Sequence, residues 1–184
     1  MHASLTSRFI ALLPAGRRCL AALVISVPFA VWGAERPVQT IAIMNFEMLD
    51  NTGETGKEAE QKARLGQITQ QLRQEFAEKK LYSVIDNAPA SALIDDLQQR
   101  FNLYSCNGCD VKIGLALNTN RVLTGWVQKV SNLILNINIQ VRDVETGNLV
   151  LNKSVDIRGN NDQTWSRGIR YIVRSMVEKN QAGL

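Results

Sequence analysis

The strongest chemical motif in this 184-residue chain is a pair of cysteines, Cys106 and Cys109. In an oxidising compartment, two cysteines at this spacing can close a small disulfide that pins a loop. The same spacing serves thiol redox enzymes, in which the first thiol sits at a helix start as a stabilised thiolate. We favour the disulfide, because this pair follows a helix and a loop, whereas redox pairs usually follow a strand. Free thiols are the third alternative.

Other residue patterns that carry chemistry are weak. The carboxylates Glu47 and Asp50 follow the first predicted strand, where α/β sheets often place sites. The stretch from Asp50 to Glu54 lacks the alternating ligands of a calcium loop. No Ser-x-x-Lys spacing and no phosphate-cradling glycine loop occurs. Two cysteines are too few ligands for a metal, so we predict no metal site. Since none of these patterns is typical of an enzyme, we also predict no catalytic residue and no cofactor.

Two polar stretches could instead face a partner protein. Residues 125–132 cross a predicted hairpin, and residues 156–162 join the last strand to the last helix. Both are richer in amides and charges than a short turn requires, and polar hairpins and strand edges commonly recruit partner segments. The alternative is that these are turn, cap and core residues. The residues predicted to contact a partner are Trp126, Gln128, Lys129, Asn132, Arg158 and Asn160.

The first 33 residues are typical of a cleaved signal peptide. Three arginines precede an almost wholly apolar run, residues 19–31, and Val31 and Gly33 provide small side chains at a cleavage site. The run is too short for a permanent membrane span and contains Pro28. Cleavage would remove His2, the only histidine, and would exclude a serine–histidine hydrolase. We therefore expect residues 34–184 to form a single periplasmic domain.

The signal and the charge balance limit the partners. Two arginines come directly before Cys19, which opens the apolar run, so the sequence predicts no lipid anchor. The arginine pair Arg17-Arg18 is compatible with either twin-arginine or ordinary export. Three of the 21 basic residues lie in the signal, and the remaining 18 face 17 acidic residues. Such a balance leaves no basic stripe for nucleic acid and gives no support for binding to a membrane surface.

The hydrophobic pattern after the signal predicts alternating strands and helices. The predicted strands are residues 38–46, 81–86, 121–130, 133–143 and 149–157. The predicted helices begin at Thr55, Asn87, Asp110 and after Asn161. For the first of these helices, Thr55 and Glu58 have the spacing of a capping box.

The clearest strand is 133–143, where apolar residues alternate with polar ones. The apolar members are Leu133, Leu135, Ile137, Ile139 and Val141. The helix between the first two strands implies a parallel pair, and the last three strands imply an antiparallel meander. We predict a two-layer α/β (α+β) domain with a mixed sheet of about five strands and helices packed on one face.

The chain resembles an uncharacterised family of exported proteobacterial proteins. Residues 106–109, 125–136, 156–160 and 41–47 carry this resemblance. The element order is similar to the TolB amino-terminal domain and to CsgG-like periplasmic domains, which are interaction modules of envelope assemblies. The resemblance implies no catalytic residue. It also implies an association with quinoprotein alcohol oxidation, because members are sometimes encoded near such systems.

These observations favour a non-enzymatic periplasmic accessory or interaction domain with a periplasmic or envelope protein as partner. The first alternative is a thiol-disulfide redox protein that uses Cys106 and Cys109. The second is a periplasmic small-ligand-binding protein, which would need a concave apolar pocket.

Overall fold

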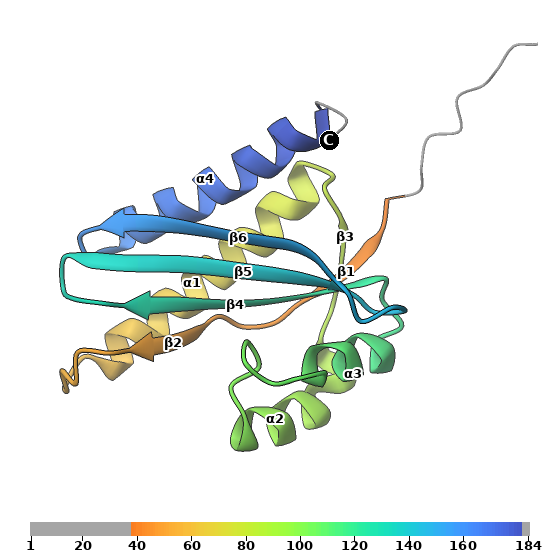
Figure 1. The fold of residues 1–184 in the computed structure, drawn as a ribbon, viewed down its shortest axis with the longest axis horizontal. Helices are drawn as coiled ribbons and strands as arrows, with labels where there is room; N and C mark the ends of the chain where they lie inside the picture. Colours follow the sequence, from red (N-terminus) through yellow and green to blue (C-terminus); the bar gives the residue numbers. More distant parts are fainter. Residues whose placement is uncertain (1–37, 182–184) are drawn as a thin grey trace, which may run out of the picture. The chain divides into compact units, whose positions relative to one another are not determined.

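The computed structural model describes residues 38–181 of the chain, and these residues contain one mixed β-sheet (Figure 1). Its strands are β1 (Thr40–Ile43), β2 (Glu47–Asp50), β3 (Ser83–Ile85), β4 (Arg121–Lys129), β5 (Ile134–Asp143) and β6 (Leu149–Arg158). The helices are α1 (Glu58–Glu78), the 3-10 helix η1 (Ala88–Ala90), α2 (Ser91–Arg100), α3 (Cys109–Ala116) and α4 (Asp162–Gln181). The predicted signal peptide, residues 1–33, lies outside the described residues.

The strand order in the sheet is β3-β1-β4-β5-β6, and β2 pairs with β4 off this path. Strand β1 runs parallel to both β3 and β4, with helix α1 in the connection to β3. Strands β4, β5 and β6 form an antiparallel meander. The predicted parallel pair, the meander and the mixed α/β fold class are therefore confirmed.

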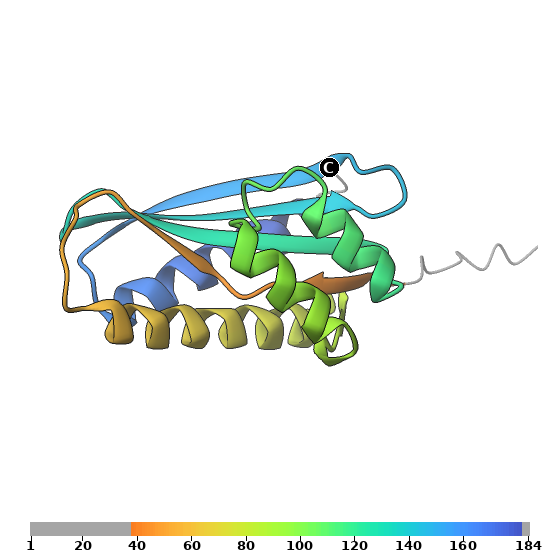
Figure 2. The same ribbon diagram turned by 90° about the horizontal axis from the view of Figure 1, so that it is seen from below.

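Helices α1 and α4 cover one face of the sheet, as Figure 2 shows for the yellow and dark blue helices. Burial of apolar side chains drives this packing. Ile68, Leu72 and Phe76 of α1 and Trp165 of α4 are at most 2% exposed. They pack against the inward side chains of the strands, which include Ile41, Ile43, Leu123, Leu135, Ile137 and Ile139.

Helices α2 and α3 form a second apolar cluster on the other face of β1 and β4, which differs from the prediction of helices on one face. Ala42 and Val122 pack there with Ile94 of α2 and Ile113 of α3. The physical reason is in the sequence of β1. Its run of consecutive apolar residues presents apolar side chains to both faces, as in a parallel strand that is buried on both sides.

The region after β1 also differs from its prediction. The strand predicted for residues 38–46 ends at Ile43, and after residues 44–46 the chain continues as β2, which was not predicted and which pairs with β4. The predicted capping box at Thr55 is wrong, because helix α1 starts later, with Lys57 at its N-cap position and no side-chain cap. Both carboxylate oxygens of Glu58 instead accept the amide of Gly56, at 3.0 Å.

Candidate functional site

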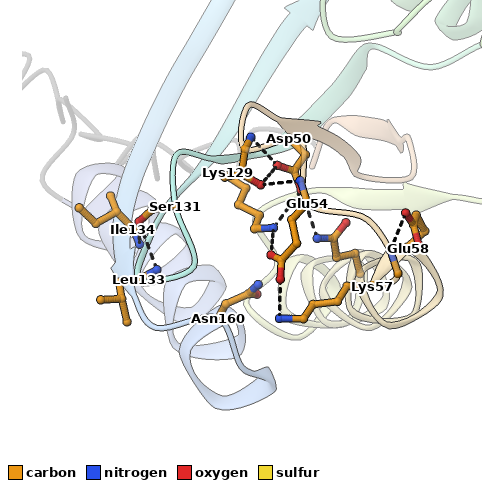
Figure 3. A network of polar contacts seen from close by, with 12 residues as sticks. Asp50, Glu54, Lys57, Glu58, Lys129, Ser131, Leu133, Ile134 and Asn160 are labelled. Atoms are coloured by element: carbon orange, nitrogen blue, oxygen red, sulfur yellow. Dashed lines mark hydrogen bonds and ion pairs between the residues drawn. The ribbon is translucent and has the colours of Figure 1, made fainter.

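Three large apolar side chains are exposed to solvent at the hairpin that joins β4 to β5. Val130, Leu133 and Ile134 are 53%, 72% and 51% exposed, and we call them the hairpin surface. The turn beneath them is hydrogen-bonded. The hydroxyl of Ser131 accepts the amides of Leu133 and Ile134 at 3.2 and 3.1 Å (Figure 3). These bonds brace the turn that carries the hairpin surface at the end of the sheet.

A buried ion-pair cluster lies at the base of this hairpin (Figure 3). Lys129, the last residue of β4, is 0% exposed although it carries an ammonium group. Its Nζ donates to Asp50 Oδ2 at 3.0 Å and to Glu54 Oε2 at 2.8 Å. Glu54 also pairs with Lys57 at 3.0 Å. Because Asp50 lies opposite Lys129 in the β2–β4 register, strand pairing itself brings the two charges together.

The cluster keeps all three of its central groups charged at neutral pH. Hydrogen bonds from Lys129 and Lys57 lower the pKa of Glu54 to about 2. Burial would raise the pKa of Asp50, but hydrogen bonds from Thr52 and Lys129 outweigh it and lower that pKa to about 2. The hydrogen bond to Glu54 raises the pKa of Lys129 against the effect of burial. A cluster so far from its titration range holds geometry and does not transfer protons near pH 7.

A second polar cluster fixes the neighbouring loop between β6 and α4. Arg64 of α1 donates from Nε to Asp162 at 2.7 Å and from Nη1 to Asn160 Oδ1 at 3.1 Å, and it also pairs with Glu60. The same Asn160 oxygen accepts the indole N–H of Trp165 at 3.0 Å. Because Trp165 is wholly buried, this bond ties the loop to the core.

The structure separates the six residues that were predicted to contact a partner. Lys129 is buried and Asn160 is half-buried, and both bond within the domain. Trp126 and Gln128 are half-buried on β4, where the Trp126 ring stacks on Tyr104 with centroids 5.0 Å apart. Asn132 and Arg158 are exposed.

Two of these positions lie next to the hairpin surface. Arg158 pairs with Ile134 in the β5–β6 register, and Asn132 lies in the turn directly before Leu133. Sequence reasoning missed the hairpin surface itself. The sequence pattern that could have indicated this surface is a polar turn, Ser131 and Asn132, with apolar residues on both sides. These apolar residues are Val130, Leu133 and Ile134.

The cysteine pair lies in a different place, on the α2–α3 side of the sheet. Cys106 and Cys109 form a disulfide, with their Cα atoms 5.6 Å apart. Cys109 is the first residue of α3 and is 6% exposed. The same loop is held at its other end by Glu47, whose carboxylate accepts the amides of Leu103 and Tyr104 at 3.1 and 3.2 Å. The disulfide is therefore part of a loop that is anchored twice.

The carboxylates Glu47 and Asp50 do not form a shared site. Glu47 bonds to the α2–α3 loop, whereas Asp50 bonds to Lys129. Burial raises the pKa of Glu47, although its backbone hydrogen bonds oppose the shift. Within residues 38–181, no group of three or more His, Cys, Asp or Glu side chains could hold a metal ion. No helix in this part of the chain has the length and apolar character needed to cross a bilayer.

Comparison with known families identifies the chain. Residues 39–177 match the family model DUF3280, described as a protein of unknown function (DUF2380). The chain belongs to the DUF3280 family. The prediction of a family of unknown function is confirmed to this extent. No curated protein matches the sequence.

The chain is similar to several solved structures, one of them with a TM-score above 0.5. Lipoprotein GNA1162 from Neisseria meningitidis has 10% identity and a TM-score of 0.52, over 76% of this chain and 99% of that one. The LpoB C-terminal domain from Escherichia coli has 14% identity and a TM-score of 0.49, over 68% and 88%. TolB from Acinetobacter baumannii has 12% identity and a TM-score of 0.44, over 80% and 29%. The likeness to GNA1162 shows a common fold and nothing about activity.

Proposed function

We propose that this DUF3280 domain is a non-enzymatic interaction module and that it binds a partner protein through the hairpin surface. The observation that carries this proposal is the exposure of Val130, Leu133 and Ile134 on a hydrogen-bonded turn. Exposed apolar side chains that gather on one hairpin favour an interaction site, because exposed apolar surface on a folded protein often marks one. A surface that is already ordered loses little entropy on binding, so more of its contact energy becomes affinity.

The buried cluster explains how the hairpin stays ordered. An exposed hairpin tip with three apolar residues would gain by folding back onto the protein. The bonds of Lys129 to Asp50 and Glu54 connect β4 to β2 and to the following loop at the root of the hairpin. This connection supports the presentation of the hairpin surface to a partner.

We place the module in the periplasm, as an accessory part of an envelope system. The signal-peptide pattern of residues 1–33 supports export. The disulfide supports an oxidising compartment. GNA1162, which shares this fold, is described as a lipoprotein, and this supports a role at the cell envelope. A partner in quinoprotein alcohol oxidation, which the family resemblance implies, is one envelope system in which this role can be sought.

A role for the disulfide in redox catalysis has less support. Thiol-disulfide exchange requires that a thiolate reach a sulfur atom. The side chain of Cys109 is buried in the apolar cluster beneath α3, with Cys106 packed against the same cluster. We therefore assign the disulfide to loop anchoring, and alkylation after mild reduction of the native protein tests this assignment.

Affinity capture with matched variants tests the proposed function. The chain from residue 34, tagged at its C-terminus, is incubated with envelope extract, crosslinked and analysed by quantitative mass spectrometry. Leu133→Asn should lose a specific protein that the natural sequence captures. Leu115→Asn, at an exposed leucine of α3 (64% exposed), should retain it. If both variants capture the same proteins in equal amounts, the hairpin surface is not the binding site.

A further inference from the structure

Strand β6 has an open edge. Among the described strands it pairs with β5 alone, and it is the last strand of the sheet. The amide of Gly159 donates to the carbonyl of Leu133 at 2.9 Å, across from the end of β5. Along an antiparallel strand, successive residues direct their backbone N–H and C=O groups alternately toward the partner strand and away from it. Since Gly159 bonds toward β5, the backbone groups of Ser154, Asp156 and Arg158 face away from β5. Another extended segment could pair with them.

A hollow of about 1100 Å³ lies beside this edge, between β6, α4 and the end of α1. Val155, Ile157 and Gly168 provide apolar lining. A Cβ atom at Gly168 would lie 2.7 Å from a side-chain atom of Ile137, so the glycine lets α4 lie close to the sheet. Tyr171, which is 52% exposed, adds an aromatic ring. The hollow can therefore accept side chains from a strand that adds to β6.

The charges around the hollow are mostly positive. Its basic lining residues are Lys79, Arg158, Arg167, Arg170 and Arg174, and its acidic ones are Glu75 and Asp156. Both carboxylates accept side-chain amide bonds, Glu75 from Gln71 at 2.7 Å and Asp156 from Asn136 at 2.6 Å. In the described part of the chain, Arg158, Arg167 and Arg170 make no ion pair, while the exposed Arg174 lies 3.9 Å from Glu178.

The position of these cations indicates a binding role. Charged residues often protect a sheet edge from aggregation, and they then sit on the edge strand itself. Here Arg158 is on β6, but Arg167, Arg170 and Arg174 lie on helix α4, and Lys79 follows the last residue of α1. Arginine clusters of this kind recognise acidic segments.

We propose that the groove between β6 and α4 binds an extended acidic segment of a partner protein, which adds to β6 as a further strand. Backbone bonds to Ser154 and Asp156 would provide affinity, and carboxylates opposite Arg167 and Arg174 would select the sequence. This groove and the hairpin surface use different residues. A negative binding result for one of these two proposed sites therefore does not count against the other site.

Fluorescence anisotropy with a defined probe tests the proposal. The probe is a short labelled peptide of alternating glutamate and valine, and the matched control replaces glutamate with lysine. We expect the acidic peptide to bind at least about tenfold more tightly than the lysine peptide, and added salt should weaken it. Equal binding of the two peptides, or no binding of the acidic one, would overturn the proposal.

Variants then separate strand addition from simple charge attraction. Ser154→Pro removes an outward amide and leaves the ladder with β5 intact, so binding should fall about tenfold. Arg167→Glu with Arg174→Glu should abolish binding, whereas Arg100→Glu on α2 should not change it. If Ser154→Pro does not fold, an acidic peptide with alternate N-methylated amides replaces it. Unchanged affinity in either strand test, or equal loss with Arg100→Glu, would contradict the assignment.

Discussion

Replacement of Lys129 by methionine should destabilise the domain even though methionine is apolar and fits a buried site. Removal of one partner of a buried ion pair costs about 3–5 kcal/mol when the remaining charge is stranded. Here the side chains of Asp50 and Glu54 are 20% and 29% exposed, so they can take water once the ammonium is lost. We therefore expect Lys129→Met to lower the free energy of unfolding by about 2–3 kcal/mol, below that range.

The side-chain stem gives a second, separable effect. Lys129→Ala also removes three methylene groups from a site that is 0% exposed, so it should cost about 2 kcal/mol more than Lys129→Met. Urea unfolding, with Lys112→Met at an exposed position of α3 as control, measures both differences. If Lys129→Met changes the free energy of unfolding by less than about 0.5 kcal/mol, the cluster does not anchor the hairpin.

Three other predictions concern stability. The pKa values of Asp50 and Glu54 fall from 3.8 and 4.5 to about 2 on folding. Their stabilisation is therefore fully present above about pH 5 and is lost as the pH falls towards 2, so Asp50→Asn with Glu54→Gln should flatten the acid side of a Tm profile. Conversion of Cys106 and Cys109 to serine should lower the free energy of unfolding in urea by about 2 kcal/mol, because the closed loop is short. Gly168→Ala gains about 1 kcal/mol of helix propensity, but its Cβ would lie 2.7 Å from Ile137 and 3.0 Å from Ile157. Because such overpacking costs about 1–3 kcal/mol, we expect a net loss of about 1 kcal/mol in the same assay. An acid profile that the Asp50 and Glu54 variant leaves unchanged, an unchanged unfolding midpoint in the double serine variant, or an undiminished stability of Gly168→Ala would each contradict its own prediction.

Local pattern was sufficient for most of the fold. The alternation along residues 133–143 predicted a strand with one apolar face, and Leu135, Ile137 and Ile139 are wholly buried. The placement of α2 and α3 could not be read in the same way. Their apolar cluster forms with strands that are distant in the sequence, and periodicity does not say which face of the sheet a helix covers.

The candidate site depended on contacts that no local pattern contains. Lysine is almost never buried without a partner, so the sequence indicated an exposed Lys129. Its partners Asp50 and Glu54 lie 79 and 75 residues away in the chain. Leu133 was placed on the apolar face by alternation, but β5 begins at Ile134 and leaves it in solvent. Strand ends are where periodicity is least informative.

Site-specific photocrosslinking in living cells shows whether the hairpin surface contacts a partner protein. A photoreactive phenylalanine analogue replaces Leu133 in one strain and Leu115 in another, since both leucines are exposed and lie on different elements. We expect one discrete crosslinked protein from position 133 and none of that protein from position 115. No crosslink at position 133, or the same product from both positions, would contradict a docking role for the hairpin surface.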